Sequence, residues 1–263
     1  MTVKQVARTG GPDMETEDRV RVNWRSVAIY YVIACLWSWP FFWRRDILHV
    51  PDTPLTSIPK LLLHWGLMWG PAIAALVCMV AFRRSHCRVI TLAGNSWVRS
   101  VLFYAAPFLL LAAFRAHVLY GYAQPALVAA FPMFVSIFGE ELGWRGFLQD
   151  ALRPLPPVKR FILIGVLWEF WHFTTRTAQG GSPLRVTVTL LISYSAVILL
   201  SFLIGYAAER SRSVVVAVSL HSYVDLLLNN LDLYLPLLLA LPVWVVLLLT
   251  WPKAATVQKP LNS

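Results

Sequence analysis

The chain has 263 residues, of which 58% are hydrophobic and only 14% are charged, whereas soluble domains carry about a quarter charged residues. This composition excludes an ordinary soluble domain and indicates an integral membrane protein with one membrane domain. The formal net charge of +10 does not indicate nucleic-acid binding, because the basic residues are scattered over short loops and no recognition module is present.

Apolar stretches long enough to cross a bilayer, at about 20 residues each, follow a polar tail at residues 1–26 and recur through a helical domain at 27–252. A short polar tail at 253–263 ends the chain. We therefore expect an all-α, polytopic transmembrane helical bundle of about eight spans. The predicted spans lie near residues 27–43, 61–82, 100–119, 125–150, 159–175, 184–208, 213–230 and 233–251.

Several prolines fall inside these predicted spans. Proline removes a backbone donor, and a membrane helix tolerates it where neighbouring helices satisfy the freed carbonyl. The prolines concerned are Pro40, Pro71, Pro107, Pro132, Pro236 and Pro242.

The distribution of lysine and arginine predicts the orientation. With the N-terminus in the cytosol, sixteen of the 23 basic residues lie in cytosolic segments and six lie opposite, with Arg145 inside the bilayer. Because basic residues are enriched in cytosolic loops, both termini are expected in the cytosol. The expected location is a cell membrane.

Three charges within six residues interrupt the predicted span at 125–150, namely Glu140, Glu141 and Arg145. Each such side chain costs roughly 2.5–3.5 kcal/mol on insertion scales and persists where it is paired or functional. Glu141 and Arg145 are four residues apart and share a helix face, which predicts an ion pair, whereas Glu140 faces elsewhere. Gly139 and Gly143 form a small-xxx-small step that allows close approach of another helix.

Two further spans carry ionisable residues: Glu169 and His172 in one, His221 and Asp225 in the other. At about 1.5 Å of rise per residue, these residues and Glu140 lie roughly 13–20 Å from the cytosolic ends of their helices. Three helices thus bring polar residues to one layer of the membrane, which favours a shared site over a packing network. The role of Glu169 stays open between orienting His172 and being solvated in the cavity.

These residues resemble the type II CAAX prenyl endopeptidase and bacteriocin-processing family of intramembrane proteases. Glu140, Glu141 and Arg145 match its Glu-Glu-x-x-x-Arg motif. Trp168 and His172 match its aromatic-x-x-x-His motif, with tryptophan in place of the more usual phenylalanine. His221 and Asp225 match its His-x-x-x-Asn/Asp motif. The resemblance covers roughly residues 125–230, and the 139–146 sequence looks like a common bacterial variant.

The resemblance implies peptide-bond hydrolysis inside the membrane, with a membrane-associated or lipid-modified peptide as substrate and the lipid bilayer as surroundings. It implies that Glu140 and His172 activate a water molecule and that His221 and residue 225 stabilise the oxyanion. An ionised aspartate cannot donate a hydrogen bond. Asp225 is therefore protonated, orients His221 or ligates a metal. No cofactor is assigned; a zinc ion, if present, would be held by Glu140, His172 and His221.

Other membrane proteins use similar residues. A rhomboid-type site needs an embedded serine nucleophile, and the aspartyl type needs Gly-x-Gly-Asp; the sequence favours neither. A transporter that relays ions or protons through the same side chains is an alternative, although no inverted repeat is visible. A non-enzymatic scaffold or immunity protein, with the polar residues serving only packing, is another.

Overall fold

In a computed structural model of the protein, the structure describes residues 21–43, 54–83, 88–113, 118–119, 122–123, 126–174, 181–229 and 238–252. The all-α class is confirmed over these residues, apart from a hairpin of two short antiparallel strands, β1 (Val118–Leu119) and β2 (Tyr122–Ala123). The helices are α1 (Trp24–Trp43), α2 (Pro54–Met68), α3 (Gly70–Ala81), α4 (Trp97–Ala113), α5 (Ala126–Gly143), the π-helix η2 (Trp144–Leu148), α6 (Gln149–Ala151), α7 (Pro157–Trp171), α9 (Pro183–Ser211), α10 (Val214–Asn229) and α12 (Ala240–Leu249).

The expectation of eight spans is met only in part. Within the described residues, α1 and α9 are long and apolar enough to cross a membrane, and α2 with α3 makes a third span if this pair, bent by 46°, is counted as one. Shorter apolar helices account for the α4, α10 and α12 regions. The number of spans and the cytosolic termini therefore stay predictions, and the two polar tails lie almost wholly outside the described residues.

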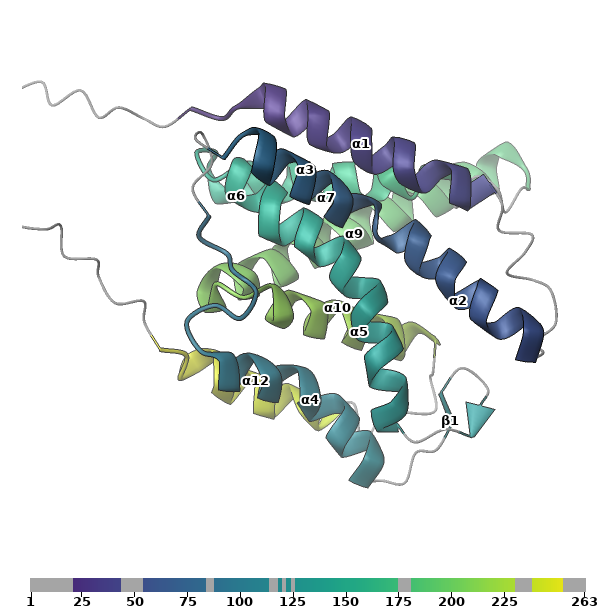
Figure 1. Cartoon of the computed structure of the whole chain (residues 1–263), viewed down its shortest axis with the longest axis vertical. Coiled ribbons are helices and arrows are strands. Elements are labelled where there is room, and N and C mark those ends of the chain that lie inside the picture. The colour runs from purple at the N-terminus through teal and green to yellow at the C-terminus, as the bar shows by residue number, and fades with distance from the viewer. Residues whose placement is uncertain are drawn as a thin grey trace, which may run out of the picture.

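Helix α5 occupies the middle of the bundle (Figure 1). It packs against α3 and α10, while α1 packs against α3, α7 pairs with α9, and α4 pairs with α12. The segment that carries the adjacent glutamates is thereby enclosed by helices from both halves of the chain. This enclosure allows charged residues to lie deep in an apolar protein without facing lipid.

Proline 107 shows how the bundle satisfies a carbonyl freed within a helix. Proline lacks the N–H that would bond to the carbonyl four residues earlier, here that of Phe103. That oxygen instead accepts hydrogen bonds from Ser219 Oγ at 2.9 Å and Trp244 Nε1 at 2.6 Å. The donors belong to α10 and α12, so the proline creates an attachment point between three helices.

Proline 71 has the same effect at the break between α2 and α3. The carbonyl four residues earlier belongs to Leu67, and it accepts a hydrogen bond from Ser38 Oγ of α1 at 2.8 Å. Neighbouring helices thus satisfy the carbonyl freed by proline at these two positions. The break also places the chain around Pro71 directly against α5.

The two glycines flanking the glutamate pair permit this contact. A Cβ atom at Gly139 would lie 2.8 Å from the carbonyl oxygen of Met68, and one at Gly143 would lie 2.6 Å from the carbonyl carbon of Pro71. Real Cβ atoms do not approach backbone so closely, so both positions require glycine for this packing. The predicted close approach of another helix is therefore confirmed, and the partner is the α2–α3 break.

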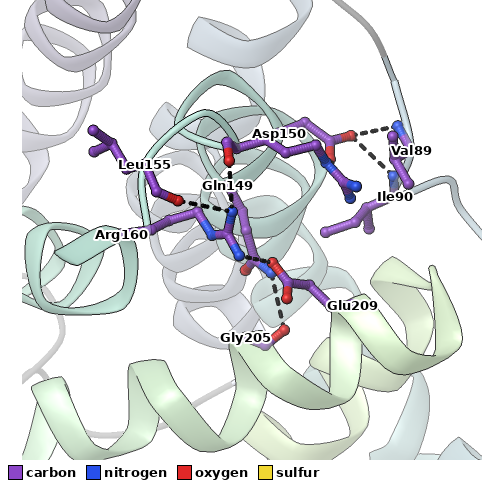
Figure 2. A network of polar contacts seen from close by, with 9 residues as sticks. Val89, Ile90, Gln149, Asp150, Leu155, Arg160, Gly205 and Glu209 are labelled. Carbon is purple, nitrogen blue, oxygen red and sulfur yellow. Dashed lines mark hydrogen bonds and ion pairs between the residues drawn. The ribbon is translucent and has the colours of Figure 1, made fainter. Parts of the chain in front are cut away.

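A buried carboxylate ties one end of the bundle together (Figure 2). Asp150, in α6, accepts hydrogen bonds from the backbone N–H groups of Val89 at 2.7 Å and Ile90 at 2.9 Å, and pairs with Arg153 at 3.4 Å. The backbone donors satisfy the charge of a side chain that is 6% exposed. The segment before α4 is thereby fixed to the end of α6.

The same network reaches α9. Gln149 Nε2 donates to the carbonyl of Gly205 at 2.9 Å, and Arg160 Nη2 pairs with Glu209 Oε1 at 2.5 Å. Figure 2 shows these contacts beside those of Asp150. Because α6, α7 and α9 are held together here, the positions of the helices that carry the polar motifs are constrained at this end.

Most basic residues of the described chain lie at this end. Figure 1 shows α1 beginning and α12 ending there, and Arg210 Nη2 donates to the carbonyl of Trp251 at 3.3 Å. Arg185, in contrast, lies in the first turn of α9 at the opposite end. The described bundle thus carries more basic residues at this end than at the opposite one, and its orientation in a membrane stays a prediction. The basic residues at the shared end are Arg25, Arg83, Arg88, Arg99, Arg153, Lys159, Arg160, Arg210 and Arg212.

Candidate functional site

The glutamate pair lies where α5 passes into a π-helix. α5 ends at Gly143 and η2 runs from Trp144 to Leu148; such π-helical turns inside α-helices occur frequently at functional sites. Arg145 Nε pairs with Glu141 Oε2 at 3.3 Å, and both side chains are fully buried. The predicted ion pair between Glu141 and Arg145 is therefore confirmed.

Glu141 has a second partner that the sequence spacing did not predict. Its other oxygen, Oε1, lies 2.8 Å from Nδ1 of His221 on α10. One buried carboxylate thus joins the arginine of its own helix segment to a histidine eighty positions along the chain. Because a carboxylate accepts at this distance, Nδ1 of His221 carries a proton and donates.

Glu140 points away from this pair, as expected, and contacts α7. Its Oε2 accepts a hydrogen bond of 2.8 Å from the indole N–H of Trp168, and the glutamate is 1% exposed. The Trp168 ring also lies under the Arg145 guanidinium, at 5.0 Å, and meets the His221 ring edge-on, with centroids 5.0 Å apart. Trp168 therefore contacts members of all three helices of the site.

His172 occupies the C-cap position of α7, directly after the last helical residue. Its Nδ1 lies 3.1 Å from the carbonyl oxygen of Trp168. A carbonyl only accepts, so Nδ1 is the donor and the neutral ring carries its lone pair on Nε2. The backbone thereby selects the tautomer that leaves Nε2 able to accept a proton.

Both histidines line one cavity of about 470 Å³. Trp168 and Asp225 also line it, and α9 contributes part of its wall with residues that include Ser193 and Ile192. Glu140 does not line this cavity directly; it lies behind Trp168, whose indole binds it. The structure therefore brings the two histidines and Asp225 to one cavity, with Glu140 one side chain away from it.

Asp225 lies one helical turn beyond His221. Its Oδ2 is 4.0 Å from Nε2 of His221, so the two form an ion pair only when the imidazole is protonated. The closer partner of His221 is Glu141. Glu141 contacts Nδ1 of His221, and Asp225 lies near Nε2 of the same ring. If Asp225 orients His221, it does so together with Glu141.

Glu169 faces the wall formed by α9. It is fully buried and accepts a hydrogen bond of 2.5 Å from Ser193 Oγ, a residue that lines the cavity. Ser193 is a site residue that sequence reasoning missed, because a lone serine in an apolar helix carries no motif. This bond links α7 to α9 beside the cavity, which Ser193 lines and Glu169 does not.

A metal site is not assembled among the described residues. Within the part of the chain that the structure describes, no three His, Cys, Asp or Glu side chains lie close enough to hold one ion. The alternative ligand set of Glu140, His172 and His221 does not fit a zinc ion in this arrangement. We therefore derive no step through a metal.

Carboxylates and imidazoles from three helices, meeting beside a cavity in an apolar bundle, define a candidate hydrolytic site of the intramembrane kind. Residues 122–227 match the family model described as type II CAAX prenyl endopeptidase Rce1-like. This part of the chain is thus a domain of that family of membrane-embedded proteases. The comparisons with curated proteins and with solved structures gave no match. Helices α1 to α4 and α12 lie outside the matched residues.

Proposed function

We propose that the protein is an intramembrane endopeptidase that hydrolyses a peptide bond of a membrane-associated or lipid-modified substrate, with water activated by glutamate and histidine. The observation that carries this proposal is the single cavity lined by His172 and His221, with Glu140 attached to its wall through Trp168. We place it in the cell membrane, and in a bacterial cytoplasmic membrane in particular.

Glu140 is the proposed general base. Because it lies one side chain from the cavity, it takes a proton through one bridging water from the water molecule whose oxygen attacks the scissile carbonyl carbon, and a proton then returns to the leaving nitrogen as the carbon–nitrogen bond breaks. The bond from Trp168 Nε1 supports this role because it fixes the direction of the carboxylate. His172, with its lone pair on Nε2, holds the attacking water from the cavity side.

His221 is the proposed stabiliser of the oxyanion. Glu141 at Nδ1 and Asp225 near Nε2 favour an imidazole that donates from both nitrogens. A donor fixed before the reaction stabilises developing negative charge at little reorganisation cost. Asp225 is then a positioning group for His221, which removes the need for it to act as a donor itself.

Substrate trapping with a Glu140→Gln variant tests the proposal. The wild-type protein and the variant are purified from the same membranes, and the peptides bound to each are identified by mass spectrometry. The matched control is Glu209→Gln, the same isosteric change in the network at the end of the bundle. We expect membrane peptides to be enriched on Glu140→Gln, and the wild-type and control proteins to cleave them.

Three results would overturn this function. If Glu140→Gln cleaves the trapped peptides as fast as wild-type, the glutamate is not the base. If no peptide is trapped and Glu140→Gln instead changes ion-dependent transport in vesicles, the site belongs to a transporter; unaltered cellular function with no trapped peptide indicates a scaffold.

A further inference from the structure

Two aromatic side chains of α1 donate hydrogen bonds to the last turns of α7. Tyr31 Oη donates to the carbonyl of Leu167 at 2.8 Å, and Trp39 Nε1 donates to the carbonyl of Trp171 at 3.2 Å. The acceptors are four residues apart and lie on one face of α7. They directly precede Trp168 and His172, the two motif residues of that helix.

The Trp171 carbonyl belongs to the end of α7, where helix carbonyls have no partner within the helix. In an apolar environment such a carbonyl needs another donor. Trp39 supplies it. Because the peptide unit is planar, fixing the carbonyl of Trp171 also fixes the plane that contains the backbone nitrogen of His172.

His172 also has contacts within its own helix segment. Its backbone N–H reaches the Trp168 carbonyl at 3.4 Å, and its Nδ1 uses the same oxygen at 3.1 Å. A third aromatic residue of α1 adds packing, since the Phe42 ring lies 5.1 Å from that of Trp171 and 6.4 Å from that of His172. Helix α1 therefore contacts the end of α7 both through hydrogen bonds and through ring packing next to His172.

We propose that Tyr31 and Trp39 are positioning residues of the active site, through which α1 holds the end of α7 and aims His172 into the cavity. Helix α1 lies outside the residues that match the protease family, so this function is additional to the three motifs. The effect on catalysis rests on the proposed function, whereas the effect on the α7 end does not.

Trp39→Phe is the informative variant because the chain offers a matched control. Trp37, two residues earlier, donates its indole N–H to the carbonyl of Gly66 in α2 at 2.8 Å. Both substitutions remove one indole donor of α1 from a helix carbonyl, but only Trp39 serves α7. We expect Trp39→Phe to lower kcat about tenfold with KM nearly unchanged, since small misplacements of catalytic groups slow reaction strongly, and Trp37→Phe to stay within about twofold of wild-type.

Tyr31→Phe is the second variant. It removes a single oxygen, keeps the ring, and guards against a folding defect in the tryptophan variant. We expect the same split between kcat and KM, and a larger loss when both substitutions are combined. Equal kcat in wild-type, Tyr31→Phe and folded Trp39→Phe would overturn the proposal, as would equal losses in Trp37→Phe and Trp39→Phe.

Hydrogen exchange separates this proposal from the proposed function. Backbone amides of residues 168–174 are followed by mass spectrometry in the purified proteins. We expect faster exchange in Tyr31→Phe and Trp39→Phe and wild-type exchange in Trp37→Phe. If exchange became faster but the wild-type protein had no peptidase activity, the contact between α1 and α7 would be supported and the proposed function would be wrong. If neither exchange nor kcat changed in the variants, the positioning role of Tyr31 and Trp39 would be wrong, and the proposed function would stand.

Discussion

Adjacent glutamates in this chain have different partners because a helix turns by about 100° per residue. Glu141 faces Arg145 and His221, and Glu140 faces Trp168. One carboxylate therefore balances a buried cation, while the other is held by a neutral donor. Substitution of each should accordingly affect a different property of the protein.

Glu141→Gln should destabilise the protein strongly. The amide can still accept a bond from His221, but the buried Arg145 charge loses its counterion, which costs about 3–5 kcal/mol. Glu140→Gln keeps an acceptor for Trp168 and should cost less than about 1 kcal/mol. Equilibrium unfolding of both variants in the same detergent measures the difference. Equal stability of the two would contradict the assigned pairing.

At the scale of elements, the site depends on the contact between α5 and the α2–α3 break. Pro71 ends the regular hydrogen bonding there, Ser38 satisfies the freed carbonyl, and Gly143 leaves room for the chain to approach. The contact lies two residues from Glu141 and at the entry to the π-helix. Widening it would displace the segment that carries the first motif.

Gly143→Ala should therefore lower stability by about 1–3 kcal/mol, because the added methyl would lie 2.6 Å from the backbone of Pro71. Gly66→Ala is the control. There the methyl would meet only the side-chain ring of Phe41, at 3.1 Å, and a ring can move aside. Thermal unfolding of both variants checks this, and a Gly143→Ala protein as stable as wild-type would refute the tight contact.

At the scale of the whole molecule, the described chain begins and ends at one end of the bundle (Figure 1), where basic residues gather. A bilayer with basic cytosolic loops would orient this end toward the cytosol. Arg185, at the start of α9, would then face the opposite side. The orientation can be measured directly.

Single cysteines introduced at Arg153 and Arg185, in a background without Cys35, Cys78 and Cys87, report this orientation. We expect a membrane-impermeant thiol reagent added to intact cells to label Arg185→Cys, and to label Arg153→Cys only after the cells are opened. Labelling of both from the outside, or the reverse pattern, would refute cytosolic termini and an even number of spans.

Much of the candidate site was predictable from spacing. The pair of Glu141 and Arg145 follows from a four-residue interval on one helix, and the close approach at Gly139 and Gly143 from two small residues one turn apart. Both are confirmed. The family also follows from residues in order along the chain, and the match at 122–227 confirms it. The catalytic roles and the domain boundaries stay predictions.

Other features depend on contacts that no local pattern encodes. The bonds of Glu141 to His221, of Trp168 to Glu140 and of Ser193 to Glu169 each join different helices. So do the bonds from α1 to the end of α7. Hydropathy places an apolar helix in the membrane, but it does not choose the rotation of that helix or its neighbours.

The amino-acid sequence by itself determined the helical class and the family, and it predicted the membrane layer in which the ionisable residues meet, because helix periodicity and the cost of burying charge act along the chain. Only the tertiary structure decided which carboxylate holds which histidine, that Glu140 lies behind Trp168, and that α1 supports His172. Those pairings arise from helices packing side by side, where distances depend on the rotation and tilt of each helix.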